Sequence, residues 1–251
     1  MILKKNKSDI EILKESGRVL GSILGTLEKN AKKGVALSEL DTLARTMAKK
    51  AGAVPTFLGY QPDGALRPYP AALCASLNDV VVHGVPTKRA LVDGDVLKID
   101  MGITYGGMIT DAARTVIIGS VSKSVRNLVS ATRKALDSAL HTVKAGRHLG
   151  DIGCAIEREA RRANVFVLRD LTGHGVGYEL HEDPIVFNFG KKGTGPLLQE
   201  GMVLAIEPMF SLSCERIVQN GDESYSSEDG SITAHFEDTV VITKKGGIVL
   251  T

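Results

Sequence analysis

Aromatic residues are scarce in this chain, which has no tryptophan, five tyrosines and six phenylalanines among 251 residues. An apolar pocket should therefore be lined mainly by aliphatic, methionine and cysteine side chains. Long apolar runs are missing too: no stretch reaches the roughly 18 residues of a membrane-spanning helix, and the first residues lack the apolar centre of a signal peptide. We therefore expect a cytoplasmic protein that needs no membrane.

The charge and the cysteine content argue against two further classes of protein, those that bind nucleic acid and those held together by disulfides. The 31 basic and 29 acidic residues give a net charge of +2, and no strong basic cluster indicates a nucleic-acid partner. Three cysteines, without the spacing of a metal site, argue against a disulfide framework and for a reducing compartment. The composition, 43% hydrophobic and 24% charged, is that of a soluble globular protein, and the length allows one large domain or two small ones.

Four amphipathic helices are predicted. Capping boxes at residues 8–11 and 38–41 mark the beginnings of the first two. An apolar stripe over residues 125–143 predicts the third helix, and the fourth is expected over about residues 149–163. Strand-like segments follow each pair, so the pattern favours an α+β fold with helices packed on one side of a largely antiparallel sheet.

The two pairs of helices resemble each other. Two stretches within residues 32–51 match two stretches within residues 144–163, both 112 positions apart. Chance similarity between helices is the alternative, but the glycine loop, the helix and its exit match together and favour a duplication. We expect one domain over residues 1–251, with halves at about 8–118 and 123–251 and a cleft between them.

A predicted β-hairpin brings two carboxylates together. Residues 95–104 alternate like a strand, and a turn at Tyr105 leads into a second strand. If Tyr105 and Gly106 form a two-residue loop, Asp100 faces Asp111; a slip of two positions leaves them diagonal on the same face. Like charges so close are destabilising unless a proton or a cation lies between them, although a solvent-exposed hairpin would tolerate them.

Three further residues stand at unusual positions. His174 lies in a glycine-rich turn, while Glu207 and Glu237 lie in apolar strand segments where an unpaired charge is costly. With Asp100 and Asp111 they make four carboxylates and one imidazole, a set that suits Mn, Fe or Co, with Zn as another choice. Four negative charges balance two divalent cations, which indicates metal-assisted hydrolysis.

Two more histidines are positioned to contact substrate rather than metal. His83 ends a strand at a Gly-Pro turn, and His181 follows His174 by seven residues. Either could instead be an ordinary surface histidine. His141 and His148 lie in or beside helices without a neighbouring motif and are expected to be ordinary.

Several of these segments together resemble the type I methionine aminopeptidases of the pita-bread metallopeptidase superfamily, over nearly the whole chain. The matching segments are residues 74–86, the Asp100 and Asp111 hairpin, 173–177 with 181–184, 201–209 and 236–237. The resemblance implies a pita-bread fold, two divalent ions (Co, Mn, Fe or Zn) and removal of the initiator methionine from nascent proteins.

The resemblance also implies individual roles. Asp100 would bind one ion through both oxygens, Asp111 and Glu237 would bridge, and His174 and Glu207 would complete the other ion's ligands. A bridging water would be the nucleophile, with Glu207 as proton shuttle. The catalytic histidines His83 and His181 would hold the scissile peptide. The substrate pocket would include Phe57, Tyr60, Tyr69, Cys74 and Leu180.

Departures from the family pattern leave alternatives open. Asp238 stands where the methionine enzymes usually have His, and Leu180 stands where Phe is common; the tryptophan often found in the pocket is absent, and its position falls near Glu223. We expect the insertion at residues 61–70 to rebuild one pocket wall. The alternatives are an Xaa-Pro aminopeptidase or prolidase and a non-enzymatic binding module. We expect a monomer, with any ribosome contact made by the catalytic domain's own surface.

Overall fold

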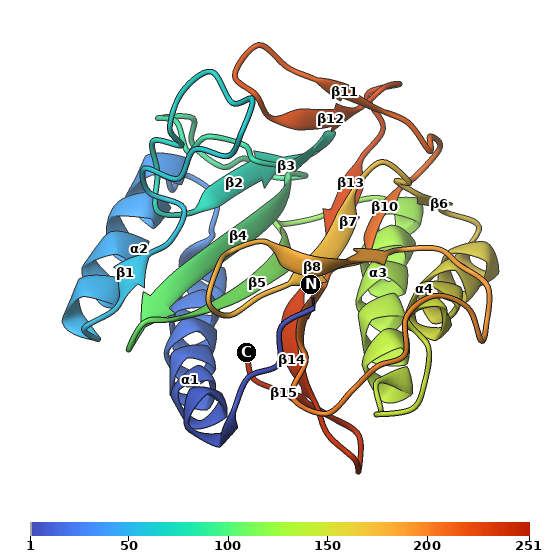
Figure 1. Cartoon of the computed structure of the whole chain (residues 1–251). Coiled ribbons are helices and arrows are strands. Elements are labelled where there is room, and N and C mark those ends of the chain that lie inside the picture. The colour runs from blue at the N-terminus through green and yellow to red at the C-terminus, as the bar shows by residue number, and fades with distance from the viewer. Residues whose placement is uncertain (1) are drawn as a thin grey trace.

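The computed structural model describes residues 2–251 and consists of four helices and four antiparallel sheets (Figure 1). The helices are α1 (Lys7–Asn30), α2 (Leu37–Lys50), α3 (Lys123–Thr142) and α4 (Leu149–Ala163). All four predicted helices are present, and α2 and α4 begin 112 positions apart. None of the helices in the described range is long and apolar enough to cross a membrane.

The predicted capping residues of the first two helices were wrong. Helix α1 begins at Lys7 because Asn6 caps it: the Asn6 side chain accepts the N–H of Asp9 at 3.1 Å, and Asp9 accepts the N–H of Asn6 at 3.0 Å. Ser8 therefore lies inside the first turn. Helix α2 begins at Leu37, and Asp41 is not a capping residue; its side chain accepts the N–H of Ala72 at 2.7 Å.

The strands form sheets of four, five, three and three strands, all with antiparallel pairing in the described range. The four-stranded sheet contains β1 (Val54–Pro55), β2 (Cys74–Leu77), β4 (Val96–Tyr105) and β5 (Met108–Ile117). The five-stranded sheet has the order β15 (Gly247–Val249), β14 (Asp238–Ile242), β9 (Val203–Ile206), β7 (Thr172–Gly175) and β8 (Glu182–Phe187). The small sheets contain β13 (Thr233–His235), β10 (Met209–Ser211) and β6 (Phe166–Val167), and β11 (Ile217–Gln219), β12 (Tyr225–Ser227) and β3 (Val80–Val82).

Each pair of helices covers its own part of this sheet system, α1 and α2 in blue and α3 and α4 in yellow-green (Figure 1). One apolar core combines α1 and α2 with β4, through residues such as Leu24, Leu40 and Ile99. A second combines α3 and α4 with the sheets of β9 and β13, through residues such as Leu136 and Leu204. This arrangement confirms the predicted α+β class with helices against antiparallel sheets.

The hairpin of β4 and β5 has the slipped register. Tyr105 pairs with Met108, so the turn is made by Gly106 and Gly107, at φ 57° and 82°. Two-residue hairpin turns of this type need positive φ at both positions, which glycine adopts without the strain that Tyr105 would carry. Direct opposition of the two aspartates was therefore wrong: Asp111 faces Gly102, and Asp100 lies diagonally from it on the same face.

The two sheet regions are joined next to this hairpin. Ala113 of β5 and Glu237 exchange backbone hydrogen bonds of 3.3 and 3.0 Å. The Thr239 hydroxyl accepts the N–H of Asp111 at 3.0 Å and donates to the Asp111 carbonyl at 2.8 Å. Acidic residues of the first and second halves of the chain therefore meet at this junction.

Candidate metal centre

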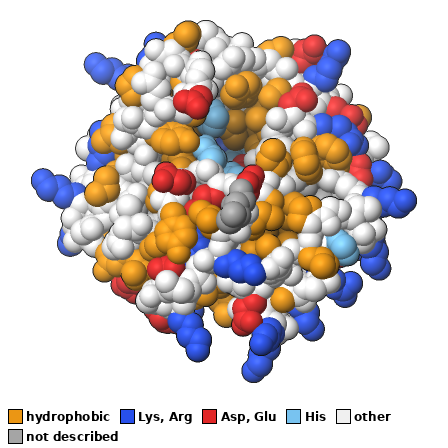
Figure 2. Space-filling model, in the orientation of Figure 1, with side chains coloured by type: hydrophobic (Ala, Val, Ile, Leu, Met, Phe, Trp, Pro, Cys, Tyr) orange, Lys and Arg blue, Asp and Glu red, His pale blue; other side chains and the backbone are white. Residues whose placement is uncertain are grey.

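A cleft of about 1300 Å³ lies over this junction. In the space-filling view, histidine side chains are visible inside a hollow that is flanked by apolar surface (Figure 2). The cleft is lined by all five predicted metal ligands, both predicted substrate histidines and all five predicted pocket residues. The ligands are Asp100, Asp111, His174, Glu207 and Glu237, and the histidines are His83 and His181. The pocket residues are Phe57, Tyr60, Tyr69, Cys74 and Leu180.

Five different segments deliver the acidic cluster. Asp100 comes from β4, Asp111 from β5 and His174 from β7, while Glu207 follows β9 and Glu237 lies between β13 and β14. The potential ligand atoms of Asp111, His174 and Glu237 all lie within 4.8 Å of one another. A second group, in which Glu237 recurs with Glu207 and His235, is equally compact.

The carboxylates are buried without counter-charges. Asp100 Oδ1, Asp111 Oδ1 and Glu237 Oε1 have no hydrogen-bond partner among residues 2–251. Burial raises the pKa of Asp111 to about 7. Burial, together with repulsion between the carboxylates, raises the pKa values of Asp100, Glu207 and Glu237 well above their usual range. Buried oxygens that repel one another and lack donors fit divalent cations, so the residues present suit a metal centre.

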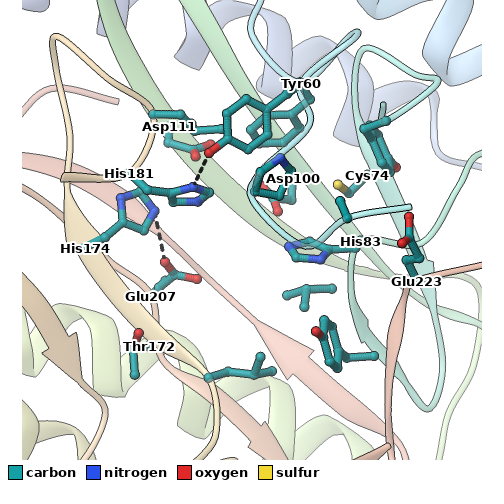
Figure 3. A pocket seen from close by; sticks show the side chains of 18 of the residues that line it. Tyr60, Cys74, His83, Asp100, Asp111, Thr172, His174, His181, Glu207 and Glu223 are labelled. Carbon is teal, nitrogen blue, oxygen red and sulfur yellow. Dashed lines mark hydrogen bonds and ion pairs between the residues drawn. The ribbon is translucent and has the colours of Figure 1, made fainter. Parts of the chain in front are cut away.

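The tautomer of His174 suits a metal ligand. Burial lowers the pKa of this histidine to about 3, so its ring is neutral. Its Nδ1 lies 2.9 Å from the Gly175 carbonyl oxygen, which can only accept, so Nδ1 carries the proton. The Nε2 lone pair then points toward the cluster, 3.4 Å from Glu207 Oε1 (Figure 3). This is the usual way in which a second hydrogen bond orients a metal-binding imidazole.

His83 and His181 flank the cluster as neutral rings. Burial lowers the pKa of His83 to about 4 and also lowers the pKa of His181. His83 adopts a left-handed backbone conformation, φ 61°, which turns its ring toward Tyr225 at a centroid distance of 5.7 Å. His181 lies 4.5 Å from the His174 ring, and its Nδ1 is 2.9 Å from the Tyr60 hydroxyl (Figure 3). Strained non-glycine backbone often marks functional positions.

An apolar wall adjoins the carboxylates. Phe57, Cys74 and Leu180 belong to one buried cluster, against which Tyr60 and Tyr69 pack. Cys74 of β2 is paired with Asp100 of β4, so the wall and the acids share neighbouring strands. The Tyr69 hydroxyl lies 3.1 and 2.9 Å from the carbonyl oxygens of Leu73 and Gly84, which share its one proton. Three of the eleven aromatic residues of this chain thus lie beside aliphatic ones at the predicted pocket.

The insertion at residues 61–70 forms an outer wall of the cleft, as expected. Its Leu66 backbone N–H donates to Glu223 Oε1 at 2.8 Å, which links the insertion to the turn between β11 and β12. Glu223 itself is held at φ 70° and lines the cleft. Glu223, near the position at which the pocket tryptophan is missing, therefore carries a carboxylate that binds the insertion.

Two buried residues beside the cluster were missed. His235 is 1% exposed and lies in the second compact group with Glu207 and Glu237. Lys98 is also 1% exposed; burial lowers its pKa to about 7, and its ammonium donates to the Asn78 carbonyl at 2.7 Å. Both precede a predicted ligand by two residues, the spacing that places strand side chains on one face, and that was the available signal.

Comparisons with known proteins agree with this geometry. The model of metallopeptidase family M24 matches residues 11–244. A methionine aminopeptidase of Clostridium acetobutylicum is 40% identical, covering 100% of this chain and 99% of the relative; one of Aquifex aeolicus is 42% identical, covering 98% and 97%.

Solved structures give the same result. The crystal structure of a methionine aminopeptidase from Thermotoga maritima has a TM-score of 0.95 and 39% identity, covering 100% of this chain and 99% of that one. A prolidase from Pyrococcus furiosus, at 22% identity and a TM-score of 0.76, shares the fold; it matches 99% of this chain but only 65% of its own length. The fold is therefore the pita-bread fold, and the chain belongs to metallopeptidase family M24.

Proposed function

We propose that this chain is a metal-dependent aminopeptidase that removes the initiator methionine from nascent polypeptides. The observation that carries the proposal is the cluster of buried, unpaired carboxylates at the base of a cleft, with an apolar pocket directly beside it. The relatives named methionine aminopeptidase span essentially the whole chain, which supports the same conclusion.

In this proposal, Asp100, Asp111, His174, Glu207 and Glu237 hold two divalent ions. The acid-rich donor set with one imidazole suits Mn, Fe, Co or Zn. Bound divalent ions would supply a Lewis acid for the peptide carbonyl and would lower the pKa of a water molecule toward neutrality. The residues themselves position the ions and, in the case of Glu207, carry a proton between the attacking water and the leaving amine.

His83 and His181 hold the scissile peptide. Both rings are neutral, so each offers one N–H donor without adding positive charge beside the ions. When the Tyr60 hydroxyl donates to Nδ1 of His181, the proton of this ring is on Nε2, where it can reach a carbonyl in the cleft. Hydrogen-bond donors fixed at this place stabilise negative charge that develops during hydrolysis.

Methionine is accommodated by the apolar wall. Phe57, Tyr60, Tyr69, Cys74 and Leu180 form a continuous surface that an unbranched thioether can fill. Leu180, in place of a larger aromatic ring, widens this surface, and the insertion at residues 61–70 closes it from outside.

The proline-specific alternative rested partly on Asp238. This residue is 2% exposed and forms an ion pair with Arg114 at 2.8 Å, from which we infer a structural role for it. It is absent from the cleft lining in the described range. The departure at this position therefore carries no substrate preference, and the prolidase similarity, at 22% identity, indicates the fold alone.

The deciding experiment loads metal-free protein separately with Mn²⁺, Fe²⁺, Co²⁺ and Zn²⁺ and compares Met-Ala with Xaa-Pro peptides. Hydrolysis of Met-Ala peptides far above Leu-Ala and Xaa-Pro peptides supports the proposal. Equal or faster cleavage of Xaa-Pro peptides would replace it with the prolidase assignment, and absence of turnover with every metal would favour a binding module. We further propose a cytoplasmic monomer, whose own surface would make any contact with the ribosome.

A further inference from the structure

His235 lacks the hydrogen bonds that a buried imidazole needs. The ring belongs to the last residue of β13, is 1% exposed and has no hydrogen-bond partner at Nδ1 or Nε2 among residues 2–251. An imidazole always carries at least one N–H donor, and buried polar groups of this kind almost always have a partner.

The backbone of His235 is firmly held. Its N–H donates to the Thr115 hydroxyl oxygen at 3.0 Å, and the same hydroxyl donates to the His235 carbonyl at 2.5 Å. This double contact fixes the end of β13 against β5. The ring is therefore presented to the acidic cluster from a rigid position, with Nε2 only 3.4 Å from Glu207 Oε2.

Glu207 lies between two imidazoles that differ in chemistry. Its Oε1 is 3.4 Å from His174 Nε2, and its Oε2 is 3.4 Å from His235 Nε2. The proton of His174 is on Nδ1, bound to the Gly175 carbonyl, so its Nε2 has only a lone pair to offer. No hydrogen bond holds the proton of His235 on Nδ1, so this ring can donate from Nε2. The two oxygens of Glu207 consequently face a metal ligand on one side and a donor on the other.

We propose that His235 is a positioning residue for Glu207: its Nε2–H donates to Glu207 Oε2 and so turns Oε1 toward the ion that His174 binds. The inference rests on the proposed metal centre and adds a residue outside the five predicted ligands. A partner of this kind orients a metal-binding carboxylate, and its loss typically lowers metal affinity 10–100-fold. An approach of 3.4 Å needs only a small shift to become a hydrogen bond of about 2.9 Å.

The test is calorimetric titration of metal-free protein with MnCl₂. His235→Gln keeps an N–H donor of similar reach, and we expect its affinity to stay within about threefold of the original protein. His235→Leu removes the donor, and we expect about 10–100-fold weaker binding at unchanged stoichiometry. The melting temperature of metal-free His235→Leu should be equal or higher, because an unpaired buried polar group is gone. His141→Leu, on α3, is the control and should leave Mn²⁺ affinity unchanged.

Several outcomes would overturn the inference. Equal Mn²⁺ affinity in His235→Leu and the original protein would remove any positioning role, and loss of one bound ion in both His235 variants would make the residue a ligand. If the original protein bound no Mn²⁺, the proposed metal centre would fall together with this inference. If His235→Leu fails to fold, His235→Asn replaces it, since its amide is too short to reach Glu207 and should bind Mn²⁺ more weakly than His235→Gln.

Discussion

The backbone N–H of Leu66 and the Glu223 carboxylate are joined by a hydrogen bond of 2.8 Å across 157 positions of sequence. This contact connects two walls of the cleft, the insertion at residues 61–70 and the turn between β11 and β12. Glu223 adopts its left-handed backbone conformation at this point, and Leu66 is 86% exposed. A polar contact between two loops thus contributes to the outer boundary of the cleft.

Breaking this contact should loosen the insertion. In Glu223→Ala, loss of one hydrogen bond worth about 1 kcal/mol should raise KM for Met-Ala peptides roughly fivefold with little change in kcat. Thermolysin should also cut faster before the exposed Leu66. Glu223→Gln keeps an acceptor oxygen and is the matched control; identical proteolysis and KM in all three proteins would show that the contact does not hold the loop.

Asp111 is expected to be indispensable for activity. Asp111→Asn keeps the size of the side chain but removes a negative charge from the cluster, so both metal binding and hydrolysis of Met-Ala peptides should be lost. Metal content after dialysis and turnover are the measurements. Asp137→Asn, on the partly exposed face of α3, is the control. Retained turnover in Asp111→Asn would contradict the two-ion assignment.

The stability of metal-free protein should depend on pH through the same residue. In the folded protein the pKa of Asp111 is raised by burial to about 7, from the 3.8 usual for an exposed aspartate. Its contribution to stability is therefore fully present below pH 3.8 and is lost as the pH rises to about 7. Asp111→Asn does not lose this contribution. Between pH 4 and 7 its free energy of unfolding, measured by urea titration, should rise relative to that of the original protein by up to about 1.4 kcal/mol per pH unit, and the difference should level off above pH 7. A constant difference across this range would contradict the raised pKa.

The hydroxyl of Tyr60 should affect turnover through His181. Tyr60→Phe removes the 2.9 Å contact that orients the ring, and we expect kcat/KM to fall about tenfold, equivalent to roughly 1.4 kcal/mol. Metal affinity should not change, since the residue does not contact the acidic cluster. Tyr105→Phe, at the turn end of β4, serves as the control. Weaker metal binding in Tyr60→Phe would instead assign this tyrosine to the metal centre.

Asp238 should matter for stability rather than for specificity. Its ion pair with Arg114 is largely buried, so Asp238→Asn leaves the guanidinium with its backbone hydrogen bonds but without a counter-charge, and should lower the free energy of unfolding by about 3 kcal/mol. The preference for Met-Ala over Xaa-Pro peptides should stay the same. Urea unfolding and the two peptide assays measure these effects, and a shift toward Xaa-Pro cleavage would restore the specificity interpretation.

The five clustered residues could be found in the sequence because each is a residue type that is unusual for the local structure around it. A charge at the end of an apolar strand, as at Glu207, or a histidine among glycines, as at His174, needs an explanation that local structure does not provide. The helices were found from their apolar period, which burial in the two cores preserves. The first cap was misplaced because asparagine caps a helix as well as serine does.

The hairpin register was misassigned although the sequence signals it, because two-residue turns of this type favour glycine at both positions and so select Gly106 and Gly107 over Tyr105. Other features could not be obtained from the sequence. His235 and Lys98 sit on the site-facing side of their strands, but the groups that face them come from segments distant in sequence. The contact between Leu66 and Glu223 likewise depends on how two loops meet in space.

The backbone pairing of Ala113 with Glu237 determines when the acidic cluster can form during synthesis. Synthesis proceeds from the N-terminus, so Asp100 and Asp111 leave the ribosome more than 120 residues before Glu237. The hydrogen bonds of Thr239 to Asp111 can form only when the last strands have emerged. The acidic cluster is therefore among the last parts of the molecule to be completed, and a truncated chain that ends before β13 should neither retain metal nor cleave peptides.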